Sequence, residues 1–151
     1  MMEKLKFRMF MLYKLPIAFL AGLRLVGLDD KKAEIRVKHR WINQNPFRSM
    51  YFAVQAMAAE ISTGLMVFRK IEQSGKSISM LVTNQDAIFT KKATGWNYFR
   101  CEDGHLISDA IDRAVATKEG QTVWVTSKAK DSTGDEVSVF RFQWSIKERT
   151  K

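Results

Sequence analysis

The sequence predicts an α+β domain in which a mainly antiparallel β-sheet curves around one buried helix. The first observation is that residues 50–59 carry no charge and include four alanines, which indicates a helix apolar on nearly every side. The second is that segments rich in β-branched and aromatic residues dominate from residue 78 onward. The third is the length: 151 residues suit a single domain with its own hydrophobic core. We therefore expect one domain over 1–151, with N-terminal helices over 1–28 and the core over 33–148.

The N-terminal segment predicts two short helices, over 3–14 and 16–26, separated by Pro16 and ended near Gly27. Basic residues and the proline interrupt its apolar run, so it does not read as a membrane-spanning helix. We expect these helices to cover an apolar face of the domain, and we do not expect membrane association.

Next in the chain, residues 33–41 alternate apolar and charged side chains, as a half-exposed strand does. Residues 43–46 read as a turn, and Ser49 is a plausible N-cap for the buried helix, which should run to about Lys70.

The remaining pattern predicts further strands and one inserted helix over 104–120, capped by Ser108. A change of apolar phase predicts a β-bulge near Arg141, and a turn is expected around 131–135. The expected strands cover 77–83, 86–92, 95–101, 122–129 and 136–147.

Composition excludes several classes of function. Lys and Arg outnumber Asp and Glu by 25 to 16, which favours anionic partners without choosing among them. The only cysteine, Cys101, can form no intramolecular disulfide, and this fits a reducing cytoplasm. No phosphate loop, dinucleotide fingerprint, zinc pattern or His-based metal site occurs, so no metal is expected.

One stretch resembles a known superfamily. In NPFRSMYFAVQAMAAE, Asn45 is followed after 60 − 45 = 15 positions by Glu60, a spacing similar to that of phenylacetyl-CoA-type thioesterases. The later stretch DAIFTKKATGWNYFRC is similar to the superfamily's strand pair. The sequence thus resembles the thioesterase-like hot-dog superfamily, and within it the branch catalogued as DUF4442.

The resemblance implies a hot-dog fold and an acyl-thioester substrate, with coenzyme A present as part of that substrate and no other cofactor. It also implies a homodimer or homotetramer, in which the helix start of one subunit and a carboxylate of the other often build one site. The carboxylate position falls on Glu60, as general base or nucleophile.

The motif departs from the superfamily at the helix start. Tyr51, Phe52 and Ala53 stand where the pattern has His-Gly-Gly, whose glycines let a thioester carbonyl approach backbone amides. A non-catalytic acyl-CoA or fatty-acyl binding protein of the same fold is therefore the alternative to a thioesterase.

Each candidate residue also has a structural reading. Glu60 is the only ionisable residue between Arg48 and Arg69, so burial should raise its pKa and suit it to activating water. Alternatively, Glu60 lies at the one solvent-exposed edge of the helix or pairs with an arginine. Asn45 could hold water or the carbonyl, or serve the turn alone. Gln55 could face the site or bond within the core.

Three basic residues are candidates for the phosphates of coenzyme A: Arg48, Lys91 and Lys92. The more usual role of such residues is that of solvated surface cations. An acyl chain is expected among Met57, Phe89 and the N-terminal helices. Exposed aromatics on basic strands could bind nucleic acid, but no such motif is present and none is expected.

Overall fold

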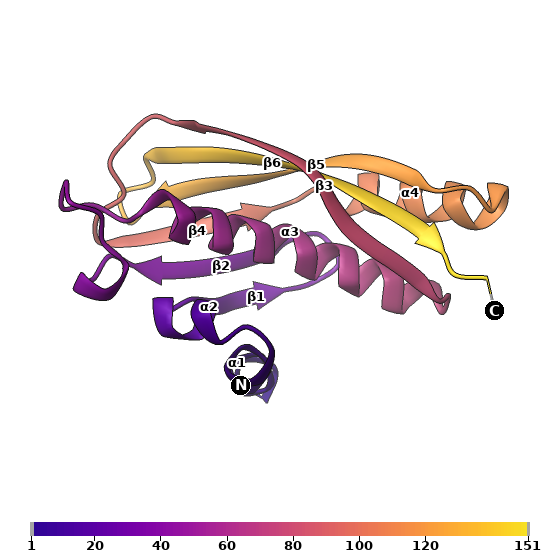
Figure 1. Cartoon of the computed structure of the whole chain (residues 1–151), viewed down its shortest axis with the longest axis horizontal. Coiled ribbons are helices and arrows are strands. Elements are labelled where there is room, and N and C mark those ends of the chain that lie inside the picture. Colours follow the sequence, from indigo (N-terminus) through magenta and orange to yellow (C-terminus); the bar gives the residue numbers. More distant parts are fainter. Residues whose placement is uncertain (1, 151) are drawn as a thin grey trace.

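The computed structural model describes residues 2–150 as an elongated α+β domain (Figure 1). A six-stranded sheet curves over a long helix, and two short helices pack beside one edge of the sheet. The elements, in chain order, are α1 (Met2–Lys14), α2 (Pro16–Ala21), β1 (Arg24–Leu28), β2 (Ala33–Lys38), the 3-10 turn η1 (Trp41–Asn43), α3 (Phe52–Ser74), β3 (Ile78–Phe89), β4 (Trp96–Cys101), α4 (Gly104–Thr117), β5 (Gln121–Asp131) and β6 (Glu136–Glu148).

The sheet has the order β1-β2-β4-β5-β6-β3, and every neighbouring pair is antiparallel. The chain crosses from one edge to the other through α3, so β3 forms the far edge and pairs only with β6. This arrangement confirms the predicted fold: a mainly antiparallel sheet around a central helix, with one inserted helix.

Small residues let α3 lie close to the sheet. Ala58 and Ala59 are fully buried, as are Phe99 of β4 and Val125 of β5, and α3 contacts both of these strands. Three polar side chains of α3 are each hydrogen-bonded to the sheet, which satisfies them in an apolar setting. These pairs are Ser138 Oγ to Gln55 Oε1 at 2.8 Å, Ser62 Oγ with Ser127 Oγ at 2.7 Å, and Trp144 Nε1 to Thr63 Oγ1 at 3.1 Å.

The N-terminal region differs from the prediction. The helix expected over 16–26 ends at Ala21, because Gly22 takes a left-handed conformation (φ 89°) that terminates it. Residues 24–28 then form β1, whose pairing with β2 was not anticipated, so the segment 1–28 is not wholly helical.

Both predicted helix caps are wrong. Helix α3 begins at Phe52 after Tyr51, and Ser49 instead bonds within the preceding loop; the helix continues to Ser74. Helix α4 begins at Gly104 after Asp103, one turn before Ser108.

The strand predictions need two corrections. Segments 77–83 and 86–92 form one strand, β3, because a bulge at Thr83 lets the chain continue. In β6 the extra residue is Val137 and not a residue near Arg141, so Phe140 already shares the inward phase of Phe142.

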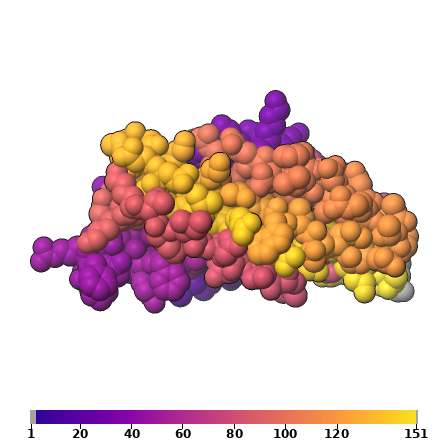
Figure 2. Space-filling view, turned by 90° about the horizontal axis from the view of Figure 1, so that it is seen from above, coloured from indigo at the N-terminus to yellow at the C-terminus, as the bar shows by residue number. Residues whose placement is uncertain are grey.

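Helix α3 is not covered all round within one chain. A stripe of half-buried residues at helical spacing remains open along it: Ala53, Ala56, Met57, Glu60 and Gly64. Figure 2 shows the molecule from the side of β5 and β6, where the second half of the chain makes most of the surface and N-terminal residues appear only at the rim.

Candidate functional site

A groove of about 480 Å³ lies at the N-terminal end of α3, between the loop that precedes this helix and the end of β3. It brings together six of the predicted site residues from segments some 40 positions apart in the sequence. The residues that line it are Asn45, Pro46, Phe47, Ser49, Met50, Tyr51, Phe52, Gln55, Phe89, Thr90, Lys91, Lys92 and Ala93. Arg48, Ala53 and Glu60 are not among them.

Asn45 organises the loop beside this groove. Its Oδ1 accepts hydrogen bonds from the backbone N–H groups of Phe47 (2.9 Å) and Ser49 (3.2 Å). Its Nδ2 donates to Ser49 Oγ at 3.0 Å. Because most of its bonding capacity is used inside the loop, the side chain is occupied in the way an Asx turn requires.

The start of α3 presents unpaired backbone amides. Val54 N–H and Gln55 N–H both donate to Tyr51 O, and Tyr51 N–H donates to Asn43 O. The N–H groups of Phe52 and Ala53 have no acceptor within residues 2–150. These are the first two amides of the helix, where the helix dipole also favours negative charge.

Aromatic rings form one wall of the groove. Tyr51 and Phe52 meet edge to face at 5.1 Å between ring centroids, and Phe52 meets Phe89 at 6.5 Å. Phe89 packs in turn on the buried ring of Phe140 at 5.5 Å. Tyr51 and Phe52 remain about half exposed, so this wall offers an apolar surface next to the free amides.

Gln55 faces the same groove from the first turn of α3, although it is only 4% exposed. Its Oε1 is fixed by the hydrogen bond from Ser138. Ser138 is a site-supporting residue that the sequence analysis missed; the signal was a serine between two valines on a strand whose inward positions are otherwise apolar.

Glu60 lies two turns further along α3, on its open stripe. The carboxyl group is half buried beside Gly64 and the Trp144 ring, and it has no hydrogen-bond or ion-pair partner within residues 2–150. Burial without a partner raises the pKa of Glu60 above its usual range. With a rise of 1.5 Å per residue, Glu60 lies about 12 Å along the helix from Phe52.

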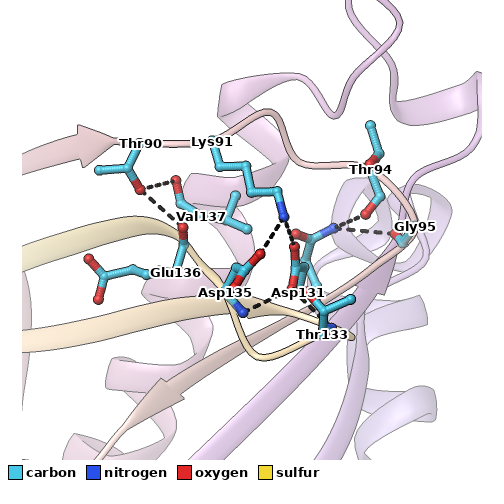
Figure 3. A network of polar contacts seen from close by, with 10 residues as sticks. Thr90, Lys91, Thr94, Gly95, Asp131, Thr133, Asp135, Glu136 and Val137 are labelled. Atoms are coloured by element: carbon cyan, nitrogen blue, oxygen red, sulfur yellow. Dashed lines mark hydrogen bonds and ion pairs between the residues drawn. The ribbon is translucent and has the colours of Figure 1, made fainter.

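The basic residues near the groove are not equivalent. Lys91 Nζ bonds to Asp131 at 2.6 Å and to Asp135 at 2.8 Å, which ties the end of β3 to the turn between β5 and β6 (Figure 3). These carboxylates raise the pKa of Lys91. Lys92 and Arg48 have no ion-pair partner in the described part of the chain, so they are the cations left available to an anionic ligand.

Two expectations about the surroundings can be compared with the structure. Phe89 lines the groove, but no described residue of α1 or α2 does, so the N-terminal helices do not contribute to this cavity. Cys101 is fully buried in β4, and burial raises the pKa of its thiol to about 12, so the thiol is unreactive in the folded chain.

Solved structures share this architecture along almost the whole chain. A probable thioesterase of unknown function from Pseudomonas aeruginosa superposes with a TM-score of 0.78 at 16% identity, with 95% of each chain covered. A protein of unknown function from Chlorobaculum tepidum gives 0.81 at 16% identity, covering 95% of this chain and 93% of the other. A thioesterase from Haemophilus influenzae gives 0.65 at 9% identity, with 95% and 90% covered. At these identities the likeness establishes the fold.

The search of curated proteins returned no match. The family model described as Domain of unknown function (DUF4442), however, matches residues 3–146, nearly the full chain. The thioesterase-like hot-dog fold seen in the solved structures agrees with this match. The chain therefore belongs to the DUF4442 family.

Proposed function

We propose that this protein hydrolyses an acyl thioester, such as an acyl-CoA, in a site formed by the groove at the start of α3 and by Glu60. The observation that carries the proposal is the pair of backbone amides at Phe52 and Ala53, which have no acceptor within residues 2–150 and belong to the helix start whose Tyr51 and Phe52 line the groove. Thioester hydrolysis develops an oxyanion, and two amides at a helix start stabilise such a charge without reorganisation. The replacement of His-Gly-Gly by Tyr51, Phe52 and Ala53 thus removes the glycines but keeps the backbone N–H groups that would donate to the oxyanion.

Glu60 would supply the base. A carboxyl group whose pKa is raised and which has no partner among residues 2–150 is a stronger base than an exposed carboxylate, and this suits it to accepting a proton from water. Asn45 Nδ2 donates to Ser49 alone within residues 2–150, so its second N–H would hold that water or the carbonyl. The acyl chain would lie along the aromatic wall, and Lys92 and Arg48 would contact the phosphates of coenzyme A.

The separation between Glu60 and the amides of the same helix favours a site shared between two subunits. Strand β3 is an edge strand of 12 residues with exposed Leu81 and Ile88, and an unpaired edge of that length is a template for another strand. Pairing of β3 with its copy would also bring the open stripes of two α3 helices together. A homodimer would then place Glu60 of one subunit near the helix start of the other.

A binding protein without turnover is the second candidate, because Phe52 and Ala53 carry side chains where the superfamily has glycine. Nucleic-acid binding has less support: the ring of Trp96 on the outer face of the sheet is covered by Arg36 at 4.6 Å, which occupies the surface a base would stack on. We propose a cytoplasmic location, because a free cysteine stays reduced in that compartment.

The first experiment is a panel of acyl-CoA chain lengths assayed with wild type and Glu60→Gln. We expect turnover by the wild type, reduced about a hundredfold or more in the variant, as for removal of a general base. Thermal stabilisation by the same ligands without turnover by the wild type would establish the binding protein instead.

The amides are tested by a matched pair of variants at the first helical position. Phe52→Pro deletes one free N–H where proline fits a helix, and Tyr51 already has the extended backbone that a following proline requires. Phe52→Ala removes the same ring but keeps the N–H. We expect kcat to fall about a hundredfold more in Phe52→Pro than in Phe52→Ala. Equal values for the two variants would remove the amide from the mechanism.

A further inference from the structure

Helix α1 is apolar on two opposite sides. Phe7 and Met11 point inward and are buried, as expected for a helix that covers the domain. Leu5, Met9 and Leu12 recur at the same helical spacing on the other side, and all three are exposed. The N-terminal helices therefore do more than cover the core: they present a second apolar stripe to the outside.

This outward surface continues onto the neighbouring elements. Ile17 and Leu20 of α2 are 68% and 61% exposed, and Trp41 of η1, which contacts α2, is 84% exposed. No helix in the described part of the chain is long and apolar enough to span a membrane. A short helix that carries exposed apolar side chains among basic ones has the composition of a helix that lies in a membrane interface.

A small cavity of about 260 Å³ opens within this surface and collects three arginines. Arg8 comes from α1, Arg24 from β1, and Arg40 from the residue before η1; Phe19 and Leu20 of α2 also line it. None of the three arginines forms an ion pair within residues 2–150. Three uncompensated guanidinium groups around one cavity favour a bound anion.

The position of Arg40 is built into the fold. Its guanidinium group lies so close to Gly22 that a Cβ there would stand 2.0 Å from Nη2, and φ of Gly22 is 89°. Gly22 thus has two roles: its positive φ ends α2, and its lack of a side chain leaves room for Arg40 at the cavity. Arg8 is held on the other side, 6.0 Å above the Phe19 ring.

We propose that α1, α2 and η1 form a docking surface for an anionic phospholipid membrane, in which the cavity of Arg8, Arg24 and Arg40 receives the phosphate of a lipid headgroup. The exposed apolar side chains of these three elements, Leu5, Leu12, Ile17, Leu20 and Trp41 among them, enter the headgroup region. Membrane docking replaces the expectation from the sequence that the protein does not associate with a membrane, and it does not depend on the proposed hydrolase activity.

Charge decides between a membrane and a second copy of the chain. Residues 1–40 contain ten Lys and Arg against four Asp and Glu. A symmetric contact between two copies of this surface would set these cations against themselves. An anionic lipid surface is complementary to them and also accommodates the apolar residues between them, which a soluble phosphate compound does not.

The test is co-sedimentation of the full chain with vesicles of phosphatidylcholine alone, and of phosphatidylcholine with phosphatidylglycerol at about three to one. We expect binding to the anionic vesicles that weakens with salt, and at least tenfold weaker binding to the neutral ones. Arg8→Gln/Arg24→Gln/Arg40→Gln should reduce binding about a hundredfold. If Arg40→Gln impairs folding, Arg8→Gln/Arg24→Gln should still reduce binding by about twentyfold.

Matched controls separate this surface from general charge and hydrophobicity. Arg113→Gln/Lys128→Gln/Lys130→Gln removes the same charge from exposed positions elsewhere and should leave binding within about threefold. Leu20→Ser should weaken binding about tenfold, while the same change at Leu106 on α4 should not.

Three results would overturn the proposal. The first is absence of wild-type binding to the anionic vesicles, or equal loss of binding in both triple variants. The second is stabilisation by inorganic phosphate or binding of an oligonucleotide, lost in the first triple variant, without vesicle binding. The third is a wild type that does not bind vesicles, together with a Leu20→Ser variant that forms a smaller assembly than the wild type in light scattering. That result would assign the surface to a contact between copies of the chain.

Discussion

Replacement of Glu60 by glutamine should make the protein more stable at alkaline pH, even though it removes the residue we assign to catalysis. Glu60 is half buried, has no hydrogen-bond or ion-pair partner in the described part of the chain, and has a pKa raised by desolvation. Glutamine keeps the size and removes the charge. Because the carboxylate is only partly buried, the gain at pH 8 should be about 1 kcal/mol, far below the cost of burying an unpaired charge completely.

The sign follows from linkage. The pKa of Glu60 is higher in the folded than in the unfolded chain. Below the unfolded pKa the group is protonated in both states, so its charge does not lower the free energy of unfolding. The charge lowers the free energy of unfolding in full only after the pH has risen through the folded pKa. The stability difference between wild type and Glu60→Gln should therefore be present at pH 8 and vanish near pH 4.

Urea unfolding followed by tryptophan fluorescence measures this difference. With a slope of about 2 kcal/mol per molar urea, the midpoint should rise by about 0.5 M at pH 8. Glu72→Gln, an exposed position on the same helix, should stay within about 0.5 kcal/mol of wild type at both pH values. A loss of stability in Glu60→Gln at pH 8 would refute the reasoning, since it would mean that the ionised carboxylate makes a stabilising contact.

Three further predictions concern the groove and the core. Ser138→Ala removes a buried hydrogen bond to α3 and should lower the free energy of unfolding by about 1–3 kcal/mol, whereas Ser145→Ala on the same strand should cost under about 0.5 kcal/mol in the same urea assay. Equal costs would show that the Ser138 bond contributes little. Cys101, with a buried thiol of pKa about 12, should react with a thiol reagent at pH 8 only after unfolding; rapid labelling of the native protein would contradict its burial. Lys92→Ala should raise KM for an acyl-CoA about threefold and leave KM for a pantetheine thioester, which lacks those phosphates, unchanged; a change with both substrates would exclude a phosphate contact.

The fold could be predicted from the sequence because its main signals are local. The uncharged, alanine-rich segment marks α3, and alternation marks most strands. The errors lie where the secondary structure of a segment depends on a special backbone conformation or on a strand that is distant in the sequence. Gly22 ends α2 through a positive φ, and residues 24–28 become a strand only because β2 lies beside them. The bulges depend on pairing register, which no single strand reveals.

The site was predicted in part for the same reason. Asn45, Phe52 and Gln55 lie near one another in the chain, so the loop and helix start could be located together. Ser138 was missed because its contact with Gln55 spans 83 positions. The pairing of Lys91 with two aspartates across a turn between other strands was equally invisible.

We infer that the first amides of α3 and the carboxylate of Glu60 act in one site, contributed by two subunits. Mixing of Glu60→Gln and Phe52→Pro subunits, after separation and reassociation, tests it directly. Each mixed dimer would hold one intact site, so a random mixture should recover about a quarter of the wild-type acyl-CoA hydrolysis from two parents that each have little. Recovery at that level would support a site shared between subunits. A mixture that stays as inactive as its parents, despite mixed dimers shown by mass spectrometry, would contradict a shared site.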